Sequence, residues 1–436
     1  MRRLSALSAM VVIAIPAFAA EPPSRYGTDA PELAHLGSYS VGVRTLHLRE
    51  PAQADVLKFD AAHGGAPLRD WELDVELWYP ANAPPRAQPV NYSASYLSEP
   101  PAPPLRIAVP GIAVRDAPPA GAGFPLVIVS HGWSDDPVAM TWVTENLASK
   151  GYVVAGIRHG DPPITDRSTL PEILLQRPLD IAFVARTLQS SLAEEKLIDP
   201  DRVALIGHST GGYGVLTAAG ATLDPTGPTS RLVPGGLLRP YARGGALEDR
   251  VRVKGLRAVV ALAPVGGGAL AAWGAEGLRS LGTPLLLIAG NHDRSVDYAT
   301  GARAMYDEAV NAARYLLTFE GGGHQIGKNP APPEARARLW DLDWFEDPVW
   351  RHDRMNAIEA HFITAFLDRY VKGDESRAPY LEVPIVQSSA GTWPQTVAPT
   401  AYDAYSPGAP EATVWKGFQR KHAEGLTLLW ALPAAN

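Results

Sequence analysis

The chain of 436 residues contains no cysteine. This absence excludes disulfide bonds, a cysteine nucleophile, a thiolate metal site and a lipid-modified N-terminal cysteine. The chain also lacks a run of basic residues, and its formal net charge is −7. We therefore expect neither nucleic acid nor an anionic membrane surface as a partner. A chain of this length can bury enough apolar surface to fold without disulfide bonds.

Long hydrophobic runs are scarce after the first twenty residues. Within those twenty residues, two arginines precede an apolar stretch, and Ala17-Phe18-Ala19 has the small-x-small pattern of a cleavage site. We interpret residues 1–19 as a secretory signal peptide followed by a linker over 20–36. A membrane anchor is the alternative, which Pro16 and the short apolar core disfavour. Because nothing later is long and apolar enough to span a bilayer, we expect export to a periplasm or the medium.

Short apolar runs alternate with helical patterns through residues 37–372. Two stretches with alternating apolar residues, 37–48 and 71–81, predict antiparallel strands that open a sheet. The later strands are expected at 124–130, 152–157, 203–206, 258–262, 285–289 and 315–319. This alternation predicts an α/β fold with a mostly parallel central sheet and helices on both faces.

The remaining segments complete the expected domain. A helix is predicted over 177–192, with Pro178 near its start, and a final helix over 352–370. Residues 86–119, rich in proline and alanine, are expected to form a surface loop. Two insertions, about 223–252 and 328–347, are expected to form a cap over the site. Residues 373–436 are expected to be a C-terminal extension packed on the domain.

One short motif indicates chemistry. Gly207-His208-Ser209-Thr210-Gly211 follows an apolar run and precedes small residues that can open a helix. This G-x-S-x-G pattern is typical of a sharp strand-to-helix turn that exposes a nucleophilic serine. Glycines are needed because side chains would crowd the bend. Ser209 is therefore the candidate nucleophile.

A candidate acid and base follow in chain order. Asp293 comes just after the run 285–289, where a carboxylate could orient a histidine. Asp297 lies in the same loop and is its competitor. His324 follows three glycines after the run 315–319. The order Ser209, Asp293, His324 is that of the α/β hydrolases.

Two loops are expected to provide backbone donors for an oxyanion. The Thr210 amide follows the nucleophile at a helix start, where the helix dipole also favours negative charge. Gly132 would permit a sharp turn after the run 124–130, and Trp133 would supply the second amide. The Trp133 indole would cover the substrate as an apolar wall; ordinary packing is the alternative.

Most of the eleven histidines are expected to be structural. By strand alternation, His208 should point its side chain away from the pocket. His131, His159 and His292 lack the spacing and the carboxylates of a zinc site. We therefore expect no metal and no cofactor.

These segments together carry a family resemblance. GHSTGG, SHGWSD, IAGNHD and GGGH, with the VELWYPA strand and the RPLDIAFVARTL helix, resemble secreted serine esterases grouped with platelet-activating factor acetylhydrolase and the dienelactone-hydrolase-like enzymes. SHGW is also similar to the S-P-G-aromatic loop of bacterial cutinases and polyester hydrolases. The resemblance covers about residues 37–372 and implies the α/β-hydrolase fold. It implies Ser209 as nucleophile, Asp293 as acid, His324 as base, and Trp133 and Thr210 as oxyanion donors. Dienelactone hydrolase itself uses a cysteine, which this chain lacks.

The sequence thus predicts a secreted serine hydrolase of carboxylic esters (EC 3.1.1.-) with an acyl-enzyme intermediate. A serine peptidase or acyltransferase on the same fold, or a non-catalytic binding protein, are the alternatives. Trp340, Trp344 and the region 232–238 favour an apolar or lipid-like ester as substrate, and so a place in lipid degradation. We expect a monomer whose partner is a small molecule.

Overall fold

The computed structural model describes residues 26–392, 413–419 and 422–434. The expected signal peptide at 1–19 lies outside the described residues. The strands are β1 Ser40–Ala54, β2 Leu68–Ala81, β3 Asn91–Tyr96, β4 Leu105–Pro110, β5 Val114–Arg115, β6 Phe124–Ser130, β7 Val153–Arg158, β8 Ile198–His208, β9 Leu256–Leu262, β10 Leu285–Gly290, β11 Arg314–Phe319 and β12 Leu426–Ala431. The α-helices are α1 Thr141–Ser149, α2 Leu170–Glu194, α3 Thr210–Ala218, α4 Pro228–Leu232, α5 Gly274–Arg279, α6 Ala304–Glu308, α7 Leu339–Leu342, α8 His352–Tyr370 and α9 Ala378–Leu381.

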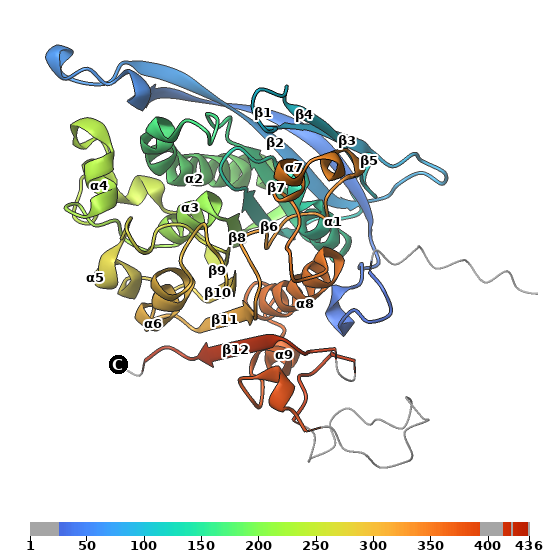
Figure 1. Cartoon of the computed structure of the whole chain (residues 1–436). Helices are drawn as coiled ribbons and strands as arrows, with labels where there is room; N and C mark the ends of the chain where they lie inside the picture. The colour runs from blue at the N-terminus through green and yellow to red at the C-terminus, as the bar shows by residue number, and fades with distance from the viewer. Residues whose placement is uncertain (1–25, 393–412, 420–421, 435–436) are drawn as a thin grey trace, which may run out of the picture.

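Within the described residues, ten strands form one sheet in the order β12-β11-β10-β9-β8-β6-β7-β2-β1-β5 (Figure 1). The six strands from β6 to β11 run parallel, whereas β2 and β12 pair antiparallel with β7 and β11. Parallel neighbours require crossover helices, which cover both faces of the sheet. This architecture is the α/β-hydrolase fold, as the sequence predicted.

Two apolar layers hold the helices on the sheet. Along β6, Leu126 and Ile128 face the layer that includes α2 and α3, while Val127 and Val129 face the layer that includes α1 and α8. All four side chains are fully buried. Because strand side chains alternate between faces, one apolar run serves both layers.

The expected helix 177–192 begins earlier than predicted, because α2 continues through Pro178. A proline in a helix leaves the carbonyl four residues earlier without its N–H donor. Here the Tyr213 hydroxyl donates to that carbonyl, Leu174 O, at 2.7 Å. A tertiary contact therefore replaces the missing helical bond.

The expected surface loop at 86–119 was also wrong in part. It contains the hairpin of β3 and β4 and the short strand β5. Tyr92 on β3 is buried and accepts a hydrogen bond from the indole of Trp78 at 2.7 Å. Many prolines obscured the alternating pattern of these strands.

The residues after 372 contribute to the sheet itself. β12 pairs with β11 from Leu426 to Ala431 and lies at the lower edge of the molecule in Figure 1, close to α9. Trp415 is 1% exposed and packs edge-to-face on Phe362 of α8. Among the described helices none is long and apolar enough to cross a bilayer.

Candidate active site

Ser209 lies on a sharp turn between β8 and α3. Its backbone angles, φ 53° and ψ −115°, are strained for a residue with a side chain. A Cβ on Gly207 would lie 2.3 Å from Gly211 O, and one on Gly211 would lie 2.0 Å from Ser130 O. Only glycine fits at either position, so the two glycines of the motif permit the turn that presents Ser209.

The structure brings Ser209, Asp293 and His324 together in one hydrogen-bonded row. His324 Nε2 is 3.0 Å from Ser209 Oγ, and His324 Nδ1 is 2.6 Å from Asp293 Oδ2. The side chains of His324 and Asp293 are 17% and 1% exposed. The imidazole thus bridges a hydroxyl and a buried carboxylate, which is the geometry needed to remove the serine proton.

The two candidate acids differ in their partners. Asp293 Oδ1 accepts the backbone N–H groups of Ser295 and Val296 at 2.8 and 3.0 Å, which leaves Oδ2 for His324. Asp297 is exposed and accepts the backbone and hydroxyl of Thr300. Those Thr300 bonds lower the pKa of Asp297. Asp297 therefore closes a turn of its own and is not bonded to His324.

The row opens into a cavity of about 720 Å³. Gly132, Trp133 and Thr210 line it together with Ser209 and His324. A Cβ on Gly132 would lie 3.0 Å from His208 Nδ1 and 3.4 Å from Ser209 Cβ. Glycine at this position therefore allows the β6 loop to approach the nucleophile closely.

The Trp133 side chain is packed rather than open. It is 5% exposed, its Nε1 donates to Pro162 O at 2.8 Å, and the Arg167 guanidinium lies 5.2 Å from its ring centroid. Only a small part of the indole can reach a substrate. Of the two sequence interpretations for this side chain, the structure favours packing.

His208 borders the same cavity but is only 2% exposed, and its side chain contacts the backbone of the candidate base. His208 Nε2 lies 3.1 Å from His324 O, and the two rings are 5.3 Å apart. Burial, followed by the charges of His324 and Lys328, lowers the pKa of His208 to about 3. A neutral His208 therefore donates to the His324 carbonyl and supports the backbone of the candidate base.

A buried ion pair lies beside the row and could not be predicted from the sequence, because its members lie far apart in the chain. Lys328 Nζ is 3.1 Å from Asp135 Oδ2, with side chains 7% and 3% exposed. Burial works to raise the pKa of Asp135, but the Lys328 ammonium, together with His131, His208 and the Asp136 N–H, holds that pKa below the usual range. Burial likewise lowers the pKa of Lys328. The pair joins the β6 loop to the segment after His324.

The two insertions differ in their relation to the cavity. The second contributes Lys328, Trp340, Asp343 and Trp344 to the lining, and its two indoles stack 6.1 Å apart. Residues 223–252 contribute none of the residues that line the cavity, so the proposed substrate contact of 232–238 was wrong. That segment packs on the core instead, since Val233 and Leu238 are 2% and 0% exposed.

Within the described part of the chain, no group of three or more histidine and carboxylate side chains could hold a metal ion. The charged groups that line the cavity are Arg167, Arg294, Lys328, Asp135 and Asp343.

Comparison with known proteins finds a family match over part of the chain. Residues 116–225, from just before β6 to just after α3, match the model of the PET hydrolase-like family, named PETase. The resemblance to polyester hydrolases is thereby confirmed over the segment that holds Gly132, Trp133, Ser209 and Thr210. A search of curated protein sequences found no significant match. Among solved structures, the chain is similar to a ferulic acid esterase from Streptomyces cinnamoneus, with 22% identity, a TM-score of 0.49, and coverage of 77% of this chain and 91% of that one.

The sheet order thus defines an α/β-hydrolase fold, and residues 116–225 within it are similar to the PET hydrolase-like family.

Proposed function

We propose that this protein is an exported serine hydrolase of carboxylic esters that works through an acyl-enzyme on Ser209. The observation that carries the proposal is the row of Ser209, His324 and Asp293, with separations of 3.0 and 2.6 Å. The position of this row supports a catalytic role, because Ser209 lies on a strained turn, which costs free energy, and lines a cavity.

The first half-reaction forms the acyl-enzyme. His324 Nε2 takes the proton of Ser209 Oγ as that oxygen attacks the ester carbonyl carbon. Asp293 stabilises the imidazolium that results. The tetrahedral intermediate then collapses, the bond to the alcohol oxygen breaks, and His324 returns the proton to the departing alcohol.

The second half-reaction uses water in place of the serine. His324 removes a proton from water, the hydroxide attacks the acyl carbon, and Ser209 leaves with the returned proton. In both halves, the backbone N–H groups of Trp133 and Thr210 would stabilise the oxyanion, each being worth about 3 kcal/mol in comparable enzymes.

The lining of the cavity supports an ester with an apolar part. Trp340, Trp344, Ile164, Val265 and Val296 supply apolar surface next to the nucleophile. The name of the matched family, PET hydrolase-like, supports the same substrate class. A panel of p-nitrophenyl esters of increasing acyl length would define the preferred chain.

One experiment separates this proposal from its alternatives. The protein is treated with a fluorophosphonate probe and assayed in parallel on p-nitrophenyl esters and peptide anilides. Labelling and ester turnover that are both lost in Ser209→Ala support the proposal. Anilide turnover without ester turnover would indicate a peptidase, and no labelling would indicate a binding protein. Residues 1–19 are part of the proposal as a cleaved export signal, which N-terminal sequencing of the exported protein tests.

A further inference from the structure

A buried guanidinium is hydrogen-bonded to the loop that follows β6. Arg177 on α2 is 1% exposed, and its Nη1 donates to His131 O at 2.9 Å. Its Nη2 donates to Asp161 Oδ2 at 2.5 Å, and that same oxygen accepts the Ser134 N–H at 3.0 Å. One ion pair therefore holds the loop at His131 and again at Ser134, on either side of Trp133.

The peptide group between Gly132 and Trp133 is held by its carbonyl. Gly132 O lies 2.7 Å from His131 Nδ1 and accepts the Asp135 N–H at 3.3 Å. In a trans peptide the N–H points opposite to the C=O. The bonds on the Gly132 carbonyl thus set the direction of the Trp133 N–H, the candidate oxyanion donor.

The contacts of His131 also define its tautomer. The His159 N–H donates to His131 Nε2 at 3.4 Å, so Nε2 is the acceptor and Nδ1 carries the hydrogen that faces Gly132 O. Burial, followed by the positive charge of Arg177, lowers the pKa of His131 and favours this neutral form. Arg177 therefore acts on the loop through His131 as well as through the ion pair.

Behind this loop lies a second row of serine, histidine and aspartate. Ser130 Oγ is 2.9 Å from His159 Nε2, and His159 Nδ1 is 2.7 Å from Asp180 Oδ2. These residues are 0%, 2% and 1% exposed, so no substrate can reach Ser130. The row fixes the end of β6, from which the loop departs, and does no chemistry of its own.

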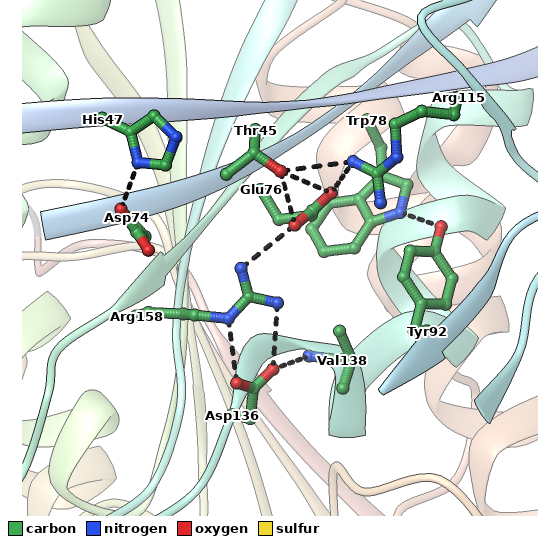
Figure 2. A network of polar contacts seen from close by, with 10 residues as sticks. All are labelled: Thr45, His47, Asp74, Glu76, Trp78, Tyr92, Arg115, Asp136, Val138 and Arg158. Carbon is green, nitrogen blue, oxygen red and sulfur yellow. Dashed lines mark hydrogen bonds and ion pairs between the residues drawn. The ribbon is translucent and has the colours of Figure 1, made fainter. Parts of the chain in front are cut away.

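The far end of the loop is held by a second arginine. Figure 2 shows Arg158 between Glu76 and Asp136, with Arg158 Nε 2.9 Å from Asp136 Oδ2 and Nη1 3.0 Å from Glu76 Oε2. Asp136 Oδ1 accepts the Val138 N–H at 2.9 Å. Residues 131–136 thus run between two guanidinium anchors, of which Arg177 is the one next to Trp133.

We propose that Arg177 is a positioning residue for ester hydrolysis, which holds residues 131–134 so that the Trp133 N–H meets the developing oxyanion. The inference rests on the proposed function. An oxyanion donor stabilises the transition state much more than the bound ester. Misplacing it should therefore lower kcat and leave substrate binding nearly unchanged.

The test compares Arg177→Met with Arg369→Met. Arg369 is a matched control, because it is also an arginine with a mostly buried side chain (11% exposed) in an ion pair. It lies on α8, away from the cavity, and pairs with Glu382 at 2.8 Å. We expect kcat of Arg177→Met to fall by about ten- to a hundredfold with KM within about twofold, and the control to keep both constants. The Ki of a trifluoromethyl ketone, which forms a tetrahedral adduct with the serine, should rise by the same factor as kcat/KM falls.

Asp161→Asn provides a second variant if Arg177→Met does not fold. It removes the charge that holds Arg177 while it keeps the side-chain shape, and the same loss of kcat and rise of Ki are expected. Unchanged kcat in a folded variant, or a rise in KM alone, would overturn the inference and leave the proposed function intact. A wild-type protein without ester turnover would instead overturn the proposed function, and the inference with it.

Discussion

Asp293 and Asp297 lie four residues apart in the loop after β10, yet only Asp293 bonds to His324, at 2.6 Å. Asp297 accepts the Thr300 backbone N–H at 2.8 Å. The two carboxylates thus provide a matched pair for testing the acid of the proposed triad.

Asp293→Asn should lower kcat by about four orders of magnitude, because the amide can hold His324 in the wrong tautomer. Asp297→Asn should keep kcat close to that of the wild type. Steady-state assays on one p-nitrophenyl ester, with melting temperatures to verify folding, make the comparison. Equal losses in the two variants would contradict the assignment of Asp293.

Gly211 is the position in the turn at Ser209 with the least room for a side chain. A Cβ there would lie 2.0 Å from Ser130 O. Gly211→Ala should therefore push the end of β6 away from α3, lower the free energy of unfolding by about 1–3 kcal/mol and displace both loops of the site. We expect a lower melting temperature together with a loss of ester turnover.

Gly282→Ala is the control for this substitution. A Cβ at Gly282 would meet no atom within 4 Å. Its effect on the free energy of unfolding should stay within about 1 kcal/mol, with full activity. Wild-type activity in Gly211→Ala would show that the turn is less constrained than its geometry indicates.

Local patterns were sufficient to predict the sheet and the three residues that the structure brings together at Ser209. The apolar run at 124–130 and the helical pattern at 352–370 coincide with β6 and α8. The G-x-S-x-G motif and the order of acid and histidine led to the three residues that the structure brings together. These features succeed because each depends on neighbours in the sequence or on the fixed order of strands.

Features that depend on distant contacts were not predictable. The continuation of α2 through Pro178 depends on the Tyr213 hydroxyl, 39 residues beyond Leu174. Strand alternation predicts the face of the sheet on which the His208 side chain lies. It does not predict that the segment after His324 folds over that face. The ion pair of Asp135 and Lys328 and the hydrogen bond from Arg177 to His131 O are also long-range contacts. The distance in sequence between their partners gives no pattern from which they could be predicted.

Lys328 and Asp135 should be strongly coupled, because both charges are buried. Lys328→Met leaves the Asp135 carboxylate buried without its ammonium, and should lower the free energy of unfolding by about 3–5 kcal/mol. The double variant Lys328→Met/Asp135→Asn removes both charges and should recover most of that loss. Denaturant unfolding of the two variants measures the recovery.

Lys58→Met is the matched control, because the Lys58 side chain is 72% exposed. Its partner Asp55 also has a second cationic neighbour, Arg69, at 3.7 Å, which remains in the variant. Its effect should be about 1 kcal/mol or less. A double variant as unstable as Lys328→Met would show that the pair does not act as a unit.

His361 on α8 should make the folded protein sensitive to acid. It is fully buried, its Nδ1 accepts the Leu33 N–H at 3.1 Å, and burial lowers its pKa to about 3. Between this value and the ordinary value of about 6.5, the unfolded chain binds a proton that the folded protein does not. Stability from this group is therefore present above about pH 6.5 and is lost as the pH falls toward 3.

The variant His361→Asn isolates that contribution, because an amide oxygen can accept the Leu33 N–H without titrating. From pH 7 to pH 5, the wild type should lose about 2 kcal/mol more unfolding free energy than the variant does. Other titrating groups, such as Asp180 and Glu359, whose pKa values burial raises, are common to both proteins and cancel in the difference. Denaturant unfolding at the two pH values gives that difference, and parallel losses in both proteins would mean that His361 is protonated in the folded state.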